Sequence, residues 1–133
     1  MKESIKIVVT GSCGCGKTSI ISRLVSESFS DEYISTEGGT FHNAEFIYHE
    51  FQGQKLKMEV WDTAGQEKYK ALTKLFYKNS NAVVLVYDTT NKDSYNDLKE
   101  YWYNQVKECV DEDISKFILY YMMYMYSTWC CWE

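Results

Sequence analysis

The chain has 133 residues, of which 45% are hydrophobic and 25% are charged, and its formal net charge is −5. This length and composition predict a single compact domain. The negative charge argues against a protein that binds nucleic acid broadly, and no apolar run is long enough to span a bilayer. We expect no signal peptide, because the chain enters a short strand pattern already within its first eleven residues.

The first predicted elements are a strand, a helix and a loop. Residues 5–10 form a short apolar, β-branched run, which is typical of a strand buried on both faces of a parallel sheet. Residues 17–28 predict a helix, because their isoleucine, leucine and valine residues recur at helical spacing. Residues 29–40 have turn composition without a period and predict a mobile loop.

A hairpin, a helix and a second buried strand follow. Residues 41–51 and 55–62 flank a short polar turn and predict an antiparallel hairpin. Residues 63–80 predict a loop that runs into a helix, and residues 81–88 predict a buried strand.

The last predicted elements are an amphipathic helix and the start of one more strand. Residues 93–110 have helical periodicity, with Asp93 or Ser94 as the expected cap, and residues 116–121 are typical of a strand. One face of the helix is apolar and carries Leu98, Trp102, Val106 and Cys109. The order strand–helix–hairpin–helix–strand–helix–strand predicts an α/β fold with helices on both faces of the sheet.

The cysteines predict neither a disulfide framework nor a zinc site. They stand at five positions: Cys13, Cys15, Cys109, Cys130 and Cys131. They form no CxxC pair, and both histidines, His42 and His49, lie far from any cysteine in the sequence. We therefore expect free thiols in a reducing, cytosolic compartment.

The segment GSCGCGKTS, residues 11–19, joins the first strand to the first helix. Gly11, Gly16, Lys17 and Thr18 fit the pattern G-x-x-x-x-G-K-[ST]. In such a loop, backbone amides and the positive end of the helix dipole face phosphate oxygens. The lysine reaches the β- and γ-phosphates, and the hydroxyl ligates Mg²⁺. The segment thus predicts a phosphate cradle.

Two other interpretations of this segment stay open. It is also compatible with a glycine-rich turn that binds nothing. Cys13 and Cys15 are expected to contribute backbone amides only, although a cysteine beside a helix N-terminus can have a lowered pKa. The second alternative is therefore redox control through these cysteines.

Two further segments indicate which family of phosphate-binding proteins the chain resembles. They are WDTAGQE at residues 61–67 and NAVVLVYDTTNKDSY at residues 81–95. With the phosphate loop, they resemble the Ras superfamily of small GTPases, and most closely its Rab branch and the Rab5-like members. The resemblance covers residues 5–108. It implies a P-loop G domain, with a mostly parallel twisted sheet, one antiparallel hairpin strand and helices on both faces. It also implies a switch that binds GTP and GDP, hydrolyses GTP slowly and acts in vesicular membrane traffic.

The resemblance assigns site residues by position. Lys17 and Gln66 would be catalytic, with Gln66 orienting the attacking water. Mg²⁺ would be held by Thr18, Thr36 and Asp62. Thr36 lies nineteen residues beyond Lys17, which is the family's spacing for this threonine. The residues that would contact the nucleotide are Ser12, Cys13, Gly14, Cys15, Gly16, Lys17, Thr18, Ser19, Phe29, Tyr33, Thr36 and Gly65.

The resemblance also implies protein partners. Phe41, Trp61 and Phe76 match the aromatic triad that Rab effectors contact, although simple core packing would also explain Phe41 and Phe76. The only arginine, Arg23, lies six residues beyond Lys17 and is expected to point away from the site. We therefore expect a GTPase-activating protein to supply an arginine, beside an exchange factor and effectors.

The resemblance is expected to end after Glu108. Residues 109–133 form a divergent tail without the family's N-K-x-D, and the last strand and helix of the domain are predicted to be missing. A truncated or mis-spliced product is one explanation, and a genuine divergent end is the other. Cys130 and Cys131 match an ending that some Rab proteins prenylate, which would place the protein peripherally on endomembranes.

Two alternative functions remain at this point. One is a truncated fragment that does not hold nucleotide and acts only as a protein-interaction module. The other is an ATP-using P-loop kinase, which the sequence DTAGQ disfavours.

Overall fold

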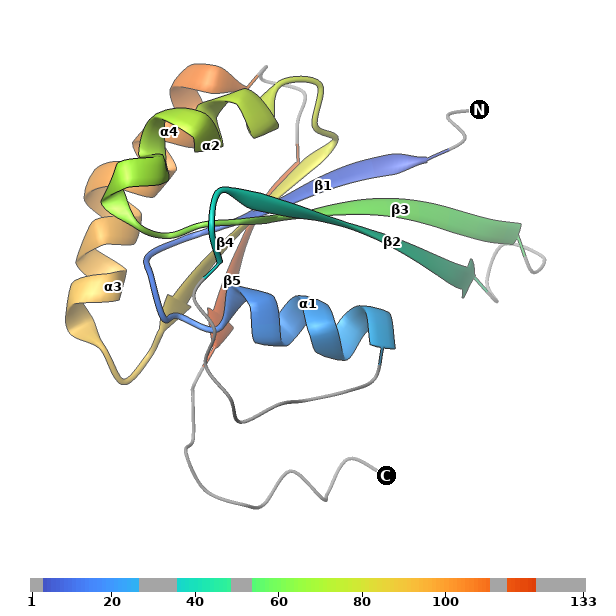
Figure 1. Ribbon diagram of the computed structural model, residues 1–133, viewed down its shortest axis with the longest axis horizontal. Coiled ribbons are helices and arrows are strands. Elements are labelled where there is room, and N and C mark those ends of the chain that lie inside the picture. Colours follow the sequence, from blue (N-terminus) through green and yellow to red (C-terminus); the bar gives the residue numbers. More distant parts are fainter. Residues whose placement is uncertain (1–3, 27–35, 49–53, 111–114, 122–133) are drawn as a thin grey trace.

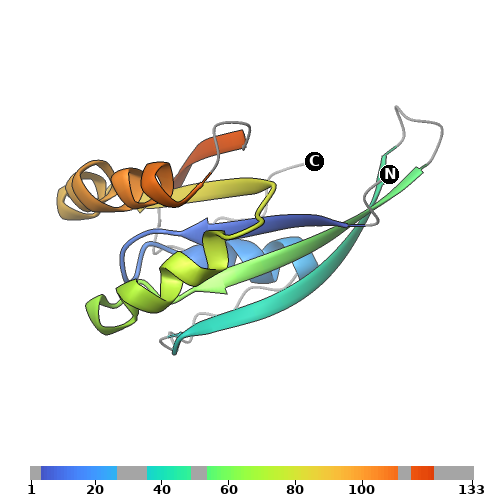
Figure 2. The same ribbon diagram turned by 90° about the horizontal axis from the view of Figure 1, so that it is seen from above.

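Within the described residues, five strands form one sheet in the order β2-β3-β1-β4-β5 (Figure 1). The computed structural model describes residues 4–26, 36–48, 54–110 and 115–121. Only β2 and β3 pair antiparallel, and the other neighbours are parallel. The strands are β1 (Ile5–Thr10), β2 (Gly39–Tyr48), β3 (Gln54–Thr63), β4 (Ala82–Asp88) and β5 (Ser115–Tyr121). The sheet is strongly twisted when seen from above (Figure 2).

The helices cover both faces of this sheet, as the sequence predicts. The structure contains α1 (Lys17–Ser26), η2 (Glu67–Tyr69), α2 (Lys70–Tyr77), α3 (Lys92–Asp97), η3 (Leu98–Trp102) and α4 (Tyr103–Cys109). Figure 1 shows α1 apart from α2, α3 and α4, with the sheet between them. The element η3 is a π-helical turn that joins α3 directly to α4.

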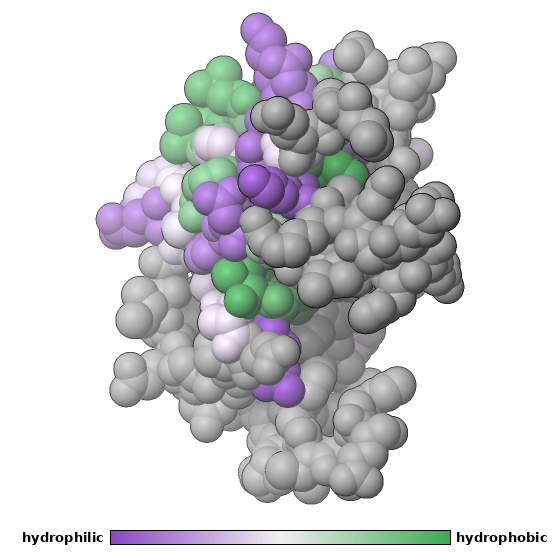
Figure 3. Space-filling view, turned by 90° about the vertical axis from the view of Figure 1, so that its right-hand side faces the viewer, coloured by the Kyte–Doolittle hydropathy of each residue, from purple (hydrophilic) through white to green (hydrophobic). Residues whose placement is uncertain are grey.

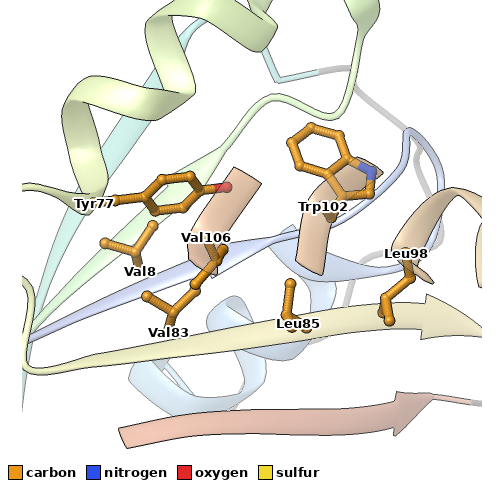
Figure 4. Packing of buried hydrophobic residues seen from close by; sticks show 7 residues of the cluster. All are labelled: Val8, Tyr77, Val83, Leu85, Leu98, Trp102 and Val106. Atoms are coloured by element: carbon orange, nitrogen blue, oxygen red, sulfur yellow. The ribbon is translucent and has the colours of Figure 1, made fainter. Parts of the chain in front are cut away.

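Two apolar clusters pack against the sheet. The larger one contains Val8, Tyr77, Val83, Leu85, Leu98, Trp102 and Val106, and Figure 4 shows these side chains together. The second contains Val9, Cys15, Ile21, Val60 and Val86. Adjacent strand residues such as Val8 and Val9 belong to different clusters, because successive side chains of a strand point to opposite faces. Both faces of β1 and β4 are therefore buried, as the continuous apolar runs predict.

The cap of α3 differs from the expected one. The side-chain oxygen of Asn91 accepts hydrogen bonds from the backbone amides of Asp93 and Ser94, at 3.0 and 3.4 Å. Neither Asp93 nor Ser94 is the N-cap, because the helix begins earlier, at Lys92. The Ser94 hydroxyl instead accepts from the Asp88 amide at 3.0 Å and so ties α3 to the end of β4.

The predicted tail contributes to the sheet. Residues 115–121 form β5, which pairs parallel to β4 from Ala82↔Ser115 to Asp88↔Tyr121. Residues 122–133 lie outside the described residues. In the part of the chain that is described, no helix has both the length and the apolar character needed to cross a membrane.

The exposed surface mixes polar and apolar residues. On the side seen in Figure 3, the described hydrophobic residues appear as separate groups among hydrophilic ones. The large hydrophobic residues with the most exposure are Leu24, Val25, Phe41, Leu72, Leu75, Tyr95 and Tyr103. Leu75 is the most exposed of them, at 69%, and it lies on α2. Large exposed apolar side chains that cluster mark candidate interaction surfaces.

Candidate functional site

The loop between β1 and α1 has the backbone that a phosphate cradle requires. Gly14 and Gly16 have φ angles of 76° and 88°, which favour glycine. A Cβ atom on Gly11 would lie 2.1 Å from the carbonyl oxygen of Val86, so a side chain does not fit there. The loop therefore bends tightly at the carboxyl end of β1 and delivers its amides to the first turn of α1.

Lys17 lies over this loop and is only 6% exposed. Its ammonium group donates a hydrogen bond to the carbonyl oxygen of Ser12 at 2.7 Å and lies 3.8 Å from the Cys15 sulfur. The positive charge is thus held against the loop, at the N-terminus of α1. An ammonium group beside a helix N-terminus attracts an anion such as a phosphate.

Cys15 is a core residue, whereas the sequence predicts that it contributes only a backbone amide to the loop. It is 1% exposed, packs in the second cluster and donates its S–H to the Val86 carbonyl at 3.3 Å. Burial raises the pKa of the Cys15 thiol, against the lowered pKa expected beside a helix N-terminus. Burial and a raised pKa both disfavour a reactive thiolate, so the described structure gives no support to the redox interpretation of Cys15. Cys13 is exposed and, like Cys109, forms no disulfide in the described chain.

Thr18, Thr36 and Asp62 meet next to the loop, as the resemblance implies. The Thr18 hydroxyl donates to one oxygen of Asp62 at 2.6 Å, and the Thr18 and Thr36 hydroxyl oxygens lie 2.9 Å apart. The second Asp62 oxygen is buried and has no hydrogen-bond partner among the described residues. Burial raises the pKa of Asp62, while the Thr18 hydrogen bond and the charges of Lys17 and His42 oppose this shift.

This oxygen cluster fits Mg²⁺. Mg²⁺ prefers hard oxygen ligands and usually combines one or two carboxylates with substrate phosphates. The unpartnered Asp62 oxygen and the two hydroxyls supply such donors. Within the described residues, no three His, Cys, Asp or Glu side chains gather into a metal site. A cation held here would therefore need oxygens from a bound ligand as well.

Gly65 and Gln66 close the other side of the loop. A Cβ atom on Gly65 would lie 2.4 Å from the Cys13 amide nitrogen and 2.5 Å from the Ser12 carbonyl carbon. The backbone of Gly65 therefore packs directly on the phosphate loop. Gln66 follows in an extended conformation, half-buried, just before the turn η2. The water-positioning role of Gln66 stays a prediction.

The aromatic triad is assembled in space. The Trp61 ring lies 5.2 Å from both Phe41 and Phe76, measured between ring centroids. Phe41 is 44% exposed and the other two are half-buried, so core packing does not explain Phe41. The Trp61 indole N–H is buried and has no partner in the described chain. The triad thus presents a partly open aromatic surface.

Comparison with known proteins identifies the family. Residues 6–121 match the family model of the Ras family. The chain belongs to the Ras family. This Ras-family match continues past Glu108, where the sequence-based resemblance was expected to end, and it includes β5.

Relatives of this Ras-family chain carry Rab and Ypt names. The chain is 36% identical over 115 residues to the Ras-related protein Rab-1C of Dictyostelium discoideum, which covers 86% of this chain and 55% of that protein. It is 35% identical over 114 residues to the Ras-related protein Rab-13 of Canis lupus familiaris, and this match covers 86% of this chain and 54% of that protein. The identity to the GTP-binding protein YPTM2 of Zea mays is 32% over 114 residues, with 86% and 54% covered.

These names support the Rab branch that the sequence predicts, whereas the Rab5-like assignment is not confirmed. The chain spans about half the length of the curated relatives it matches.

Four of the predicted site residues are not described. Phe29, Tyr33, Cys130 and Cys131 lie outside the described residues. Ser19 is half-buried in the first turn of α1.

Contacts to Ser12 were missed by the sequence interpretation. The Ser12 hydroxyl contacts Asp97 at 2.9 Å and the Trp102 indole nitrogen at 3.2 Å. These partners are 85 and 90 residues away in the chain, and no local motif links them to the Ras-family loop.

Proposed function

We propose that this Ras-family chain is a Rab-type small GTPase, which binds GTP and GDP with Mg²⁺ and hydrolyses GTP slowly. The observation that carries the proposal is the meeting of Thr18, Thr36 and Asp62 beside the phosphate loop. Oxygen donors next to a P-loop suit a nucleoside triphosphate that brings its own phosphate oxygens to the cation. Guanine as the base is inferred from the family and from relatives that are named GTP-binding proteins, because the phosphate loop and the oxygen cluster do not select a base.

Binding of the phosphates would rest on the loop and on Lys17. Backbone amides of residues 12–18 and the N-terminus of α1 would donate to the α- and β-phosphates. The Lys17 ammonium has three donors, of which the Ser12 carbonyl and the Cys15 sulfur take two, so one would be available to the phosphates. Mg²⁺, when bound, would offset the charge of the β- and γ-phosphates. Thr18, Thr36 and Asp62 would hold it there.

Hydrolysis would proceed by in-line attack of water on the γ-phosphate. Gln66 would orient the water, and the Gly65 amide would contact the γ-phosphate. Arg23, the only arginine, is exposed in the last turn of α1, about 9 Å along the helix axis from Lys17. It is therefore poorly placed to stabilise charge between the β- and γ-phosphates. Fast turnover would need an arginine from an activating protein.

The same site would act as a switch for protein partners. Thr36 and Gly65 lie on the two segments that would respond to the γ-phosphate, and these segments flank the triad of Phe41, Trp61 and Phe76. Loss of the γ-phosphate would relax both segments and alter the aromatic surface. We propose effectors and an exchange factor as partners and vesicular traffic as the process. Peripheral attachment to endomembranes through Cys130 and Cys131 stays a prediction.

Nucleotide retention and phosphate release test this proposal. Purified chain would be incubated with Mg²⁺ and GTP, and bound nucleotide and released phosphate would be quantified. We expect retention and slow phosphate release, both lost in Lys17→Ala. The matched control Lys74→Ala changes an exposed lysine of α2 and should keep both. Equal behaviour of the wild type and Lys17→Ala would contradict the proposal and would favour the interaction-module hypothesis.

A further inference from the structure

The hydroxyl of Ser12 is held by two side chains of the helical segment 92–109. It donates to Asp97 Oδ2 at 2.9 Å and accepts from the Trp102 indole nitrogen at 3.2 Å. A serine hydroxyl has one donor and two acceptor sites, so its donor is engaged and its direction is set. The second residue of the phosphate loop is therefore tied to the helical segment 92–109.

The π-helical turn η3 explains how one helix supplies both partners. In a regular α-helix, residues five positions apart differ by about 140° around the axis. A π-helical turn closes hydrogen bonds between residues five apart, as the Tyr103 amide does with the Leu98 carbonyl. This turn brings Asp97 and Trp102 to the same side of the helix, toward Ser12. π-Helical turns inside α-helices are frequent at functional sites.

Trp102 gives this contact a rigid base. The indole is 1% exposed and packs among Leu98, Val106 and their neighbours in the larger apolar cluster (Figure 4). Its N–H donor thus has a fixed position. Asp97 is exposed, so its carboxylate can be changed without opening the core.

Ser12 transmits the constraint to the site. Its carbonyl oxygen accepts the hydrogen bond from the Lys17 ammonium at 2.7 Å. Its carbonyl carbon is also one of three loop backbone atoms against which Gly65 packs, beside the Cys13 nitrogen and the Gly11 oxygen. A displacement of Ser12 would therefore move both the phosphate-binding lysine and the contact with Gly65.

We propose that Asp97 and Trp102 are positioning residues for the phosphate loop, and that they act by fixing Ser12 and, through its carbonyl, Lys17. We call this set of four residues the Ser12 clamp. The expected effect of the Ser12 clamp on nucleotide release rests on the proposed function, whereas its expected effect on the loop backbone does not. The clamp is expected to slow nucleotide release without contacting the nucleotide through Asp97 or Trp102.

The first experiment measures the loop without nucleotide. Amide hydrogen exchange of residues 11–17 is compared in the wild type, Asp97→Ala, Asp97→Asn and Trp102→Phe. We expect about three- to tenfold faster exchange in Asp97→Ala and Trp102→Phe, each of which loses one hydrogen bond. Asp97→Asn keeps an acceptor oxygen and should restore most of the protection. Glu100→Gln, on the exposed side of η3, is the control and should match the wild type.

The second experiment measures release of fluorescent GDP from the same variants. We expect the same order of rates, with Asp97→Ala and Trp102→Phe fast, Asp97→Asn near the wild type and Glu100→Gln unchanged. Failure of every variant and of the wild type to bind GDP would count against the proposed function. Amide hydrogen exchange of residues 11–17 would then still show whether the Ser12 clamp fixes the loop. Unchanged loop exchange in both Asp97→Ala and Trp102→Phe would overturn the inference. Asp97→Ala keeps the test valid if Trp102→Phe unfolds.

Discussion

Replacing Gly65 with alanine should distort the phosphate loop. The added Cβ atom would lie 2.4 Å from the Cys13 nitrogen, 2.5 Å from the Ser12 carbonyl carbon and 2.6 Å from the Gly11 oxygen. All three are backbone atoms, which cannot rotate away. An ordinary contact needs about 3.5 Å, so the loop or residues 64–66 must shift by roughly 1 Å.

The expected cost follows from this shift. Overpacking at a buried site lowers the free energy of unfolding by about 1–3 kcal/mol, and we expect the upper half of that range because no flexible side chain relieves the contact. A misplacement of about 1 Å can also reduce the rate of a reaction about a hundredfold. Nucleotide binding and hydrolysis should therefore fall more than stability alone explains.

The assay is urea unfolding, which gives the free energy of unfolding of the wild type, of Gly65→Ala and of the control variant Glu67→Ala. Glu67 is exposed two residues further along, and its replacement should change the free energy of unfolding by less than about 0.5 kcal/mol. GTP hydrolysis would be measured in both variants under conditions where they are folded. An unfolding free energy of Gly65→Ala within about 0.5 kcal/mol of the wild type would refute the reasoning.

Four further predictions follow from the site. Gln66→Leu should slow single-turnover GTP hydrolysis and leave GTP binding intact, and an unchanged rate would contradict the water-positioning role. Thr18→Asn should weaken GTP more than GDP, since a cation held by Thr18 would offset the additional charge of the γ-phosphate; titrations with equal losses would argue against Thr18 as a ligand. Burial raises the folded-state pKa of Asp62 above 3.8, so folding favours its protonated form. In the Mg²⁺-free chain, the free energy of unfolding of the wild type minus that of Asp62→Asn should therefore decrease as the pH rises from the usual carboxyl range through this raised pKa. An increase of this difference over the same pH range would contradict a raised pKa of Asp62. Finally, residues 1–133 should show little preference for GTP over ATP in competition, because residues 122–133, which follow β5, contain no N-K-x-D. Two lost hydrogen bonds to a charged group would cost about 3–6 kcal/mol, or about a hundredfold to ten-thousandfold in affinity, and strong guanine selectivity would refute this.

Local patterns in the sequence predict the elements and the loop well. The apolar runs of β1 and β4 and the motif from Gly11 to Thr18 are contiguous, so each carries its own signal. The family's spacing from Lys17 predicts Thr36 and the segment WDTAGQE predicts Asp62, and the structure brings both to Thr18.

Contacts that depend on one helical turn could not be predicted. Periodicity places Leu98, Trp102 and Val106 on the core face, and this is confirmed. It does not reveal the π-helical turn that also directs the Trp102 indole nitrogen to Ser12. The burial of Cys15 was missed for a similar reason, because a cysteine between glycines shows no apolar period although its side chain meets Val86.

The Mg²⁺ dependence of nucleotide binding tests the central claim most directly. Affinity for GTP and GDP would be measured with and without Mg²⁺ in the wild type, in Asp62→Asn and in Asp93→Asn, an exposed acid in the first turn of α3. The proposed site predicts that Mg²⁺ strengthens binding in the wild type and in Asp93→Asn, and that Asp62→Asn loses most of this gain. Equal Mg²⁺ dependence in Asp62→Asn and the wild type would contradict the claim that Thr18, Thr36 and Asp62 form the magnesium site.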